Sequence, residues 1–125
     1  MKEVPRISEA EWQVMKQLWA SSPSTANNIV EALSAKTNWK PKTIKTLLNR
    51  LVKKKALGYQ KKGREYHYYP LVNETECVKA ESRSFLQRVY DGFAKPMLAA
   101  FLENGDLSPE DIEELKRILD KKGGG

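Results

Sequence analysis

Cysteine and histidine each occur only once in this chain of 125 residues. The single Cys77 cannot close an intramolecular disulfide or supply a cysteine-based zinc site, which argues against a disulfide-stapled secreted module and against a metal centre. No run of about 18 apolar residues occurs, and the first residues lack the apolar stretch of a signal peptide. We therefore expect a soluble cytoplasmic protein that holds no metal and no other cofactor.

Patterns typical of enzymes are absent as well. The sequence has no motif for an activated nucleophile, no glycine-rich phosphate loop and no paired catalytic carboxylates, so we predict that the protein is not an enzyme. His67 has no second histidine or acidic cluster beside it and is interpreted as a structural residue. The position of Cys77 at a helix start could lower its thiol pKa, but a plain buried or half-buried thiol is the more ordinary interpretation.

Carboxylates are missing from a long central window. The whole chain has 22 Lys and Arg residues against 16 Asp and Glu residues, but no acidic residue lies between Glu31 and Glu65. Divided after residue 72, the charge is +9 in the first part and −3 in the second. Such a basic segment is typical of proteins that bind nucleic acid or an anionic membrane surface. The window holds eleven basic residues with no carboxylate to compensate them: Lys36, Lys40, Lys42, Lys45, Arg50, Lys53, Lys54, Lys55, Lys61, Lys62 and Arg64.

Capping residues and apolar periodicity predict two helices near the start of the chain. Ser8 and Glu11 form a capping box for a helix over residues 9–20. Ser24 is the expected N-cap of a second helix over residues 25–36.

A third helix is predicted from Pro41 to about Lys54, since proline is well tolerated at the first helical position. One side carries apolar residues at helical spacing and is committed to the core: Ile44, Leu47, Leu48, Leu51 and Val52. The opposite side and its flanks carry amide, hydroxyl and cationic side chains that suit base edges and phosphates. Because its apolar side is used by the core, this helix has nothing to insert into a membrane, and nucleic acid is the favoured partner.

The tyrosine-rich segment 57–70 predicts a β-hairpin that turns around Gly63. Four of its side chains are expected to pack on the helices: Leu57, Tyr59, Tyr66 and Tyr68. Three helices followed by a basic hairpin form the winged-helix arrangement. The predicted DNA-binding residues are Lys42, Thr43, Lys45, Thr46, Asn49, Arg50, Lys53, Lys62 and Arg64.

The last third of the chain is predicted to be helical. Asn73 and Glu76 begin a helix that ends near Tyr90, a shorter helix covers residues 94–104, and Ser108 caps the last one. Three short helices form a thin core alone, so we expect them to pair with a second copy of the chain. The predicted dimerisation residues are Val78, Phe85, Val89, Met97, Phe101, Leu115, Ile118 and Leu119.

The predicted fold is thus mainly α, as a small α+β protein. Residues 1–72 form a winged helix-turn-helix DNA-binding domain with a β-hairpin wing, and residues 73–125 form a three-helix dimerisation domain.

Several segments carry a resemblance to a known family. They are residues 7–15 (ISEAEWQVM), residues 39–51 (WKPKTIKTLLNRL), and Gly63-Arg64 with Tyr66 and residues 68–70. They resemble the penicillinase-repressor (BlaI/MecI) family of winged-helix regulators. Weaker similarity at residues 84–86 and 101–104 extends the resemblance over nearly the whole chain.

This resemblance implies a homodimeric repressor of palindromic operators, commonly built on TACA and TGTA half-sites. The operators would lie upstream of β-lactamase or penicillin-binding-protein genes and of the repressor's own operon. Matched by position, Lys42, Thr43, Lys45 and Thr46 would contact the operator from the recognition helix, with Arg50 and Arg64 on the backbone. An alternative is a winged-helix module that binds a partner protein, or a regulator of an unrelated operon.

The resemblance also implies relief by proteolysis, triggered through a membrane β-lactam sensor and often occurring at an Asn-Phe bond. The matching bond here is Ala100–Phe101, which leaves cleavage and the inducing signal open. Copper-responsive relatives carry a cysteine cluster near the C-terminus; this chain has none there, which disfavours copper sensing.

Overall fold

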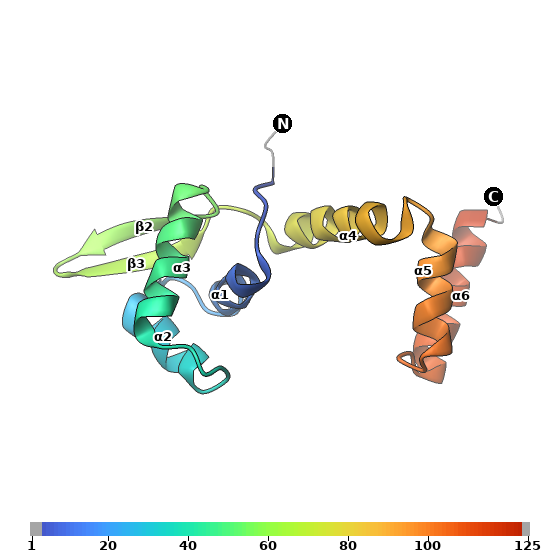
Figure 1. Cartoon of the computed structure of the whole chain (residues 1–125), viewed down its shortest axis with the longest axis horizontal. Helices are drawn as coiled ribbons and strands as arrows, with labels where there is room; N and C mark the ends of the chain where they lie inside the picture. Colours follow the sequence, from blue (N-terminus) through green and yellow to red (C-terminus); the bar gives the residue numbers. More distant parts are fainter. Residues whose placement is uncertain (1–3, 124–125) are drawn as a thin grey trace. The chain divides into compact units, whose positions relative to one another are not determined.

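The computed structural model describes residues 4–123 and divides into two compact units, one ending at Ala80 and the other beginning at Glu81. Figure 1 shows the helices and strands of both along the chain. The division falls inside a helix, because Cys77 near its start is buried in the core of the first unit. The functional boundary predicted after residue 72 stays a prediction.

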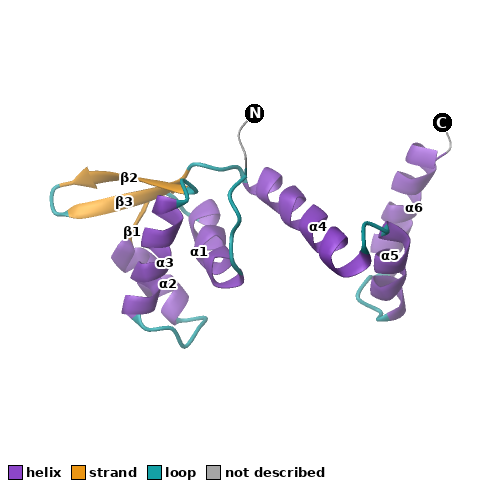
Figure 2. Cartoon of the chain, turned by 45° about the horizontal axis from the view of Figure 1, so that its top comes forward, coloured by secondary structure: helices purple, strands orange, loops and turns teal. Residues whose placement is uncertain are grey.

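The first unit contains three helices and a small sheet. Its elements, in order, are α1 (Glu9–Ala20), β1 (Ser24–Thr25), α2 (Ala26–Ser34), α3 (Pro41–Lys53), β2 (Leu57–Lys62) and β3 (Glu65–Pro70), followed by the start of α4 (Glu74–Tyr90). The sheet is antiparallel with the strand order β1-β3-β2. Figure 2 shows the β2–β3 hairpin projecting to one side, beyond the three helices. The predicted winged-helix order of elements is confirmed, and β1 is an addition that the sequence pattern did not indicate.

One apolar core joins the three helices to the base of the hairpin. Its buried members are Ile7, Val14, Met15, Leu18, Ile29, Leu33, Ile44, Leu47, Leu48, Leu51, Ala56, Leu57 and Cys77. At the edge of this core the Trp19 indole donates to the Val72 carbonyl over 3.0 Å, which ties α1 to the segment before α4. The apolar side predicted for the third helix is therefore the side that the core covers.

The capping box predicted at Ser8 is present. The Ser8 amide donates to a Glu11 carboxylate oxygen at 2.9 Å, and the Glu11 amide donates to the Ser8 hydroxyl at 3.2 Å. The prediction that Ser24 caps the second helix is wrong. Thr25 is the N-cap and accepts from the Asn28 amide, because Ser24 and Thr25 first pair with β3 and only Thr25 then adjoins the helix.

Two glycines shape the hairpin. Gly63 has φ +65°, a left-handed conformation that side-chain-bearing residues rarely adopt and that the tight turn requires. At Gly58 a Cβ atom would lie 2.9 Å from Cζ of Tyr69, so the Tyr69 ring occupies the space above this residue. The hairpin predicted around Gly63 is confirmed.

The packing predicted for the hairpin is only partly right. Leu57 is buried and Tyr68 packs against the core, but Tyr59 is 51% exposed and Tyr66 is 43% exposed. Tyr59 lies on β2, the edge strand, directly opposite Tyr68 on the central strand β3, and Tyr66 lies two residues nearer the tip than Tyr68, so the core covers Tyr68 but leaves the other two exposed.

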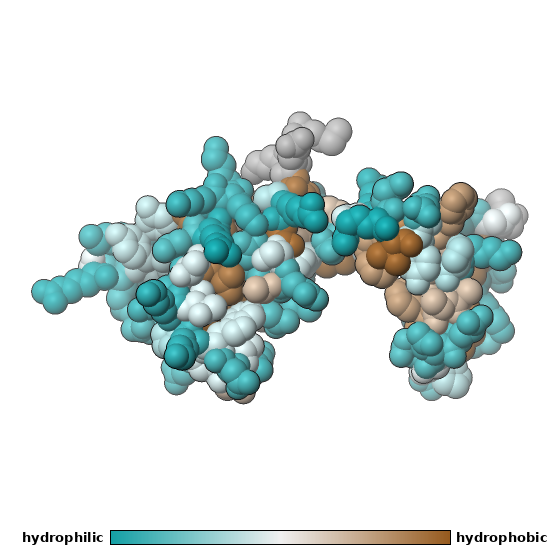
Figure 3. Space-filling model, in the orientation of Figure 1, coloured by the Kyte–Doolittle hydropathy of each residue, from teal (hydrophilic) through white to brown (hydrophobic). Residues whose placement is uncertain are grey.

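The second unit consists of the rest of α4 with α5 (Ala94–Glu103) and α6 (Pro109–Gly123). Figures 1 and 2 show α5 and α6 running alongside each other. Ser108 caps α6 as predicted, in a reciprocal pair of hydrogen bonds with Asp111. Within the described residues no side chain after Cys77 is buried, and apolar surface is visible over this unit in Figure 3. None of the helices among residues 4–123 combines the length and apolar character needed to cross a bilayer.

Candidate nucleic-acid interface

The solvent-facing side of α3 brings together the residues that the sequence singled out. Ile44, Leu47, Leu48 and Leu51 are buried beneath the helix. All seven candidate residues on this helix are exposed: Lys42, Thr43, Lys45, Thr46, Asn49, Arg50 and Lys53. The helix therefore presents a continuous polar, cationic surface without a carboxylate.

This surface has an edge that faces the hairpin. Lys45, Asn49 and Lys53 line hollows whose other wall is formed by tyrosines of the hairpin. At 100° per residue, Lys42 and Thr46 point away from the core, and Thr43 and Arg50 lie on the flank remote from the hairpin. The seven residues thus form three rows along one helix.

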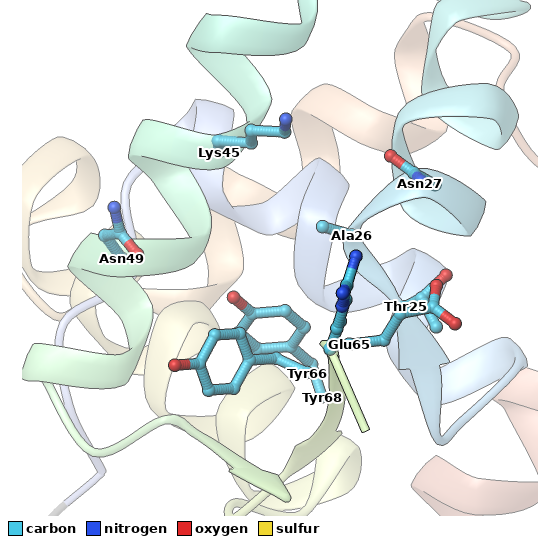
Figure 4. A pocket seen from close by; sticks show the side chains of 9 residues that line it. Thr25, Ala26, Asn27, Lys45, Asn49, Glu65, Tyr66 and Tyr68 are labelled. Carbon is cyan, nitrogen blue, oxygen red and sulfur yellow. The ribbon is translucent and has the colours of Figure 1, made fainter. Parts of the chain in front are cut away.

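Two neighbouring hollows separate α3 from the hairpin. The first, of about 310 Å³, also reaches the start of α2; it is lined by Thr25, Ala26, Asn27, Lys45, Asn49, Arg64, Glu65, Tyr66 and Tyr68. The second, of about 370 Å³, is lined by Asn49, Val52, Lys53, Tyr59, Tyr66 and Tyr68. Figure 4 shows Tyr66 and Tyr68 with their rings between the hairpin and α3, on the side where Lys45 and Asn49 lie.

The Thr46 hydroxyl is already engaged within the helix. It donates to the carbonyl of Lys42 over 3.0 Å. The hydroxyl proton of Thr46 is therefore engaged in this hydrogen bond. With a DNA base, the side chain can still accept a hydrogen bond through its oxygen or make an apolar contact through its methyl group.

One of the eleven cations in the central window is not available to a polyanion. Lys54 donates to the carboxylate of Glu11 and to the carbonyl of Arg6, which joins the end of α3 to the start of α1. Burial raises the pKa of Glu11, but the hydrogen bonds from Lys54 and Ser8 outweigh it and hold the pKa below its usual value. Among residues 4–123, the other ten cations form no ion pair with a carboxylate. The expectation of eleven uncompensated cations is thus wrong at Lys54 alone.

The hairpin tip carries the remaining candidates in exposed positions. Lys62 and Arg64 flank the turn, and the Lys61 ammonium lies 5.8 Å from the centre of the Tyr66 ring. Glu65 is the one carboxylate of this neighbourhood among the described residues that line the two hollows. Burial raises the pKa of the Tyr68 phenol, and its neighbouring tyrosines raise it further, so this group is a neutral donor near pH 7.

Sequence reasoning missed part of this surface. Tyr59 and Tyr66 are predicted to pack on the helices, and the sequence pattern gives no signal for Thr25 and Asn27 as site residues. The period-2 alternation of the strands indicates which hairpin residues share a face, but not how far that face extends past the helices.

The predicted dimerisation residues lie on surfaces left uncovered. Val78, Val89, Phe101, Ile118 and Leu119 are exposed, while Phe85, Met97 and Leu115 are half-buried. The Ala100–Phe101 bond lies within α5, and the Phe101 side chain is 41% exposed.

Cys77 and His67 have ordinary structural positions. Cys77 is 2% exposed, and burial together with the charge of Glu76 raises the pKa of its thiol, as expected for an unreactive cysteine. His67 lies in β3 opposite Gln60 and Thr25. No cluster of three metal-ligating side chains occurs within residues 4–123.

Comparison with known proteins identifies the family. The family model described as Penicillinase repressor matches residues 7–121. The chain belongs to the penicillinase repressor family. The penicillinase repressor of Bacillus licheniformis is 45% identical over 121 residues, which cover 97% of this chain and 94% of the relative. The methicillin resistance regulatory protein MecI of Mammaliicoccus sciuri is 41% identical over 116 residues, which cover 93% and 94%.

Solved structures of the penicillinase repressor family agree with the fold described above. The DNA binding domain of the repressor BlaI is 45% identical with a TM-score of 0.55, and the match covers 61% of this chain and 93% of that one. A structure of the Bacillus licheniformis BlaI monomeric form in complex with the blaP half-operator matches with the same identity and coverage and a TM-score of 0.54. As a member of this family, the chain is a winged-helix transcriptional repressor and not an enzyme.

Proposed function

We propose that the protein is a cytoplasmic, dimeric repressor that binds a palindromic operator upstream of β-lactam-resistance genes and of its own operon. The observation that carries the proposal is the exposed, carboxylate-free face of α3 beside a basic hairpin. The relative with a solved half-operator complex shares 45% identity with this chain over the matching region, which supports the same kind of ligand here.

The individual residues have distinct roles in this proposal. Lys42, Thr43, Lys45 and Thr46 lie in the first half of α3 and are proposed to read bases, as the N-terminal part of a recognition helix does in a major groove. Lys53 and Arg50, nearer the end of the helix, are proposed to neutralise phosphates together with Lys62 and Arg64 at the wing. Asn49 lies between these groups and faces the hairpin.

A second copy of the chain is the proposed partner of α4–α6. Large apolar side chains remain exposed on these helices and at Phe93, the N-cap of α5; those on the helices are Val78, Val89, Leu98, Phe101, Leu102, Ile118 and Leu119. Exposed apolar side chains in such number mark an interaction surface, and covering them with an identical surface is the economical solution. Two copies would place their α3 helices in successive major grooves, about 34 to 36 Å apart.

Relief of repression by proteolysis is the proposed regulatory step. A bond in this second unit, Ala100–Phe101, is the proposed cleavage position, and a membrane β-lactam sensor is the proposed origin of the signal. Cleavage there would divide α5 and so remove the surface proposed to hold the dimer together.

The test is a fluorescence-anisotropy titration of the full chain at two salt concentrations. The ligands are a palindromic duplex with TACA and TGTA half-sites, a random duplex of equal length and an RNA duplex. We expect the tightest binding to the palindrome and a steep weakening with salt. Equal, weak binding to all three would contradict the proposal and favour a partner protein as the ligand. Preference for another duplex, footprinted upstream of the chain's own gene, would favour a regulator of an unrelated operon.

A further inference from the structure

A row of tyrosines lies on the face of the hairpin that is turned toward α3. Tyr59 pairs with Tyr68, and Lys61 pairs with Tyr66, across the antiparallel ladder, so these four side chains share one face. The Tyr59 and Tyr66 rings are 5.0 Å apart and perpendicular, and the Tyr59 and Tyr68 rings are 6.2 Å apart. The ring of Tyr59 on β2 therefore supports the rings of Tyr66 and Tyr68 on β3 across the two strands.

Only one tyrosine of this row packs against the core of the first unit. Tyr68 packs against the buried residues, whereas Tyr59 and Tyr66 leave about half of their surface exposed. Edge-to-face packing of the two rings holds both in place. The hairpin thus presents two ordered phenol groups to solvent beside the recognition helix.

The wall opposite these phenols is polar and positively charged. Asn49 and Lys53 of α3 face Tyr59 and Tyr66 across one hollow, and Lys45 of α3 faces Tyr66 across the other, which Arg64 lines from the hairpin side. With Lys61 over the Tyr66 ring, four cations stand against the single carboxylate of Glu65. The ligand whose charge complements these two hollows is therefore an anion. Because the hollows adjoin each other between α3 and the hairpin, an extended anion fits them.

The placement of α3 in a major groove determines what that anion is. With α3 proposed to lie in a major groove, the sugar-phosphate strand that borders this groove is the polyanion next to the hairpin beside the helix. We propose that Tyr59 and Tyr66 contact this strand, with their hydroxyls donating to phosphate oxygens and their rings resting on deoxyribose. In this arrangement Asn49 faces the same strand and contacts the backbone, not an adenine. The inference rests on the proposed function and adds residues to its DNA surface.

A phenol on a phosphate has a distinctive signature. It is neutral, so losing its hydroxyl lowers affinity without changing the number of counterions that binding releases. Loss of a lysine contact lowers the affinity and the salt slope together. The two kinds of backbone contact can therefore be separated in one titration.

The experiment measures binding of Tyr59→Phe, Tyr66→Phe and the double variant to palindromic and random duplexes at several salt concentrations. Each single change is expected to weaken both duplexes by about tenfold, with an unchanged slope of log K against log salt. Tyr69→Phe is the matched control: this tyrosine is 38% exposed on the opposite face of the same hairpin, above Gly58, and its change should have no effect. Lys53→Ala is the positive control, because loss of a lysine contact should reduce the slope of log K against log salt.

Three results would overturn the inference. Unchanged affinity of the double variant would exclude the contact. A loss confined to the palindrome would make the tyrosines base readers. A reduced salt slope would mean that they act only by positioning a lysine. In all of these, the wild-type chain binds duplex DNA and the proposed function stands. A wild-type chain that binds no duplex would overturn both.

Discussion

The two units of this chain place their apolar side chains in opposite ways. The first buries thirteen of them in one core beneath its three helices and the base of the hairpin. In the second, no described residue is buried, and Phe93, Phe101 and Leu119 are between 41% and 67% exposed. The first unit is therefore stabilised by its own apolar core. The second unit leaves apolar side chains exposed, which indicates a surface that a partner covers.

Charge follows the same division. The basic surface lies entirely on the first unit, on α3 and the hairpin, while α6 in the second unit begins with acidic residues that favour its helix dipole. One unit is thus arranged for an anionic ligand, and the other for an apolar contact.

Removal of the second unit is expected to have the largest effect on DNA binding. A chain ending at Ala80 is expected to stay folded and monomeric, and to bind a palindromic duplex about 10²- to 10⁴-fold more weakly, since a linked second module no longer assists. A chain ending at residue 72 removes Cys77 from the core and should in addition be less stable to urea. Circular dichroism, sedimentation and anisotropy measure these outcomes. Undiminished operator affinity of the shorter chains would contradict a role for the second unit in binding.

Substitution of one leucine in each unit tests whether the second unit contributes to the stability of the first. Leu48→Ala, at 1% exposure, should lower the free energy of unfolding by about 2–5 kcal/mol, because it leaves a cavity. Leu119→Ala should change the free energy of unfolding of the first unit by less than about 0.5 kcal/mol, because Leu119 lies in the second unit and outside that core. All three tryptophans lie in the first unit, so their fluorescence in urea reports on that unit. A similar loss for both variants would show that the units share one core.

The ion pair between α1 and α3 gives the first unit a pH dependence. Glu11→Gln should lower the free energy of unfolding by about 1–3 kcal/mol at pH 7, since the carboxylate is buried and Lys54 is partly screened by solvent. Because folding lowers the pKa of Glu11, its stabilising effect is full above the unfolded-state pKa and is lost as the pH falls through the folded-state value. Urea titrations should therefore show the two proteins converging below about pH 4. Parallel curves at all pH values would contradict this role.

Two α3 substitutions have the smallest expected effects and distinguish phosphate contact from base reading. Lys53→Ala should weaken palindromic and random duplexes about equally and reduce the salt slope by about one. Thr46→Ala should reduce the preference for the palindrome and leave the slope unchanged. Anisotropy at several salt concentrations measures both. An equal loss on both duplexes for Thr46→Ala would show that it does not read bases.

Much of the first unit is predictable because its signals are local. Ser8, Glu11 and Pro41 mark helix starts by interactions within a turn, and the apolar spacing of α3 identifies its buried side. The exposed candidates on α3 follow from the same spacing.

The features of the first unit that the sequence did not predict depend on contacts between residues distant in sequence. A strand of two residues has no pattern of its own, so β1 and the resulting N-cap at Thr25 become evident only when β3 lies beside them. Glu11 and Lys54 are 43 residues apart, and no local rule pairs them. The exposure of Tyr59 depends on the place of β2 at the edge of the sheet, and that of Tyr66 on its position nearer the tip than Tyr68.

The central claim is that a second copy covers the apolar surface of α4–α6 and so joins two DNA-reading units. Sedimentation equilibrium of the full chain at micromolar concentration, without DNA, tests it most directly. The expected mass is that of two chains, and Phe101→Asp should reduce it to that of one chain while the tryptophan fluorescence of the first unit stays unchanged. A single-chain mass for the unmodified protein would contradict it.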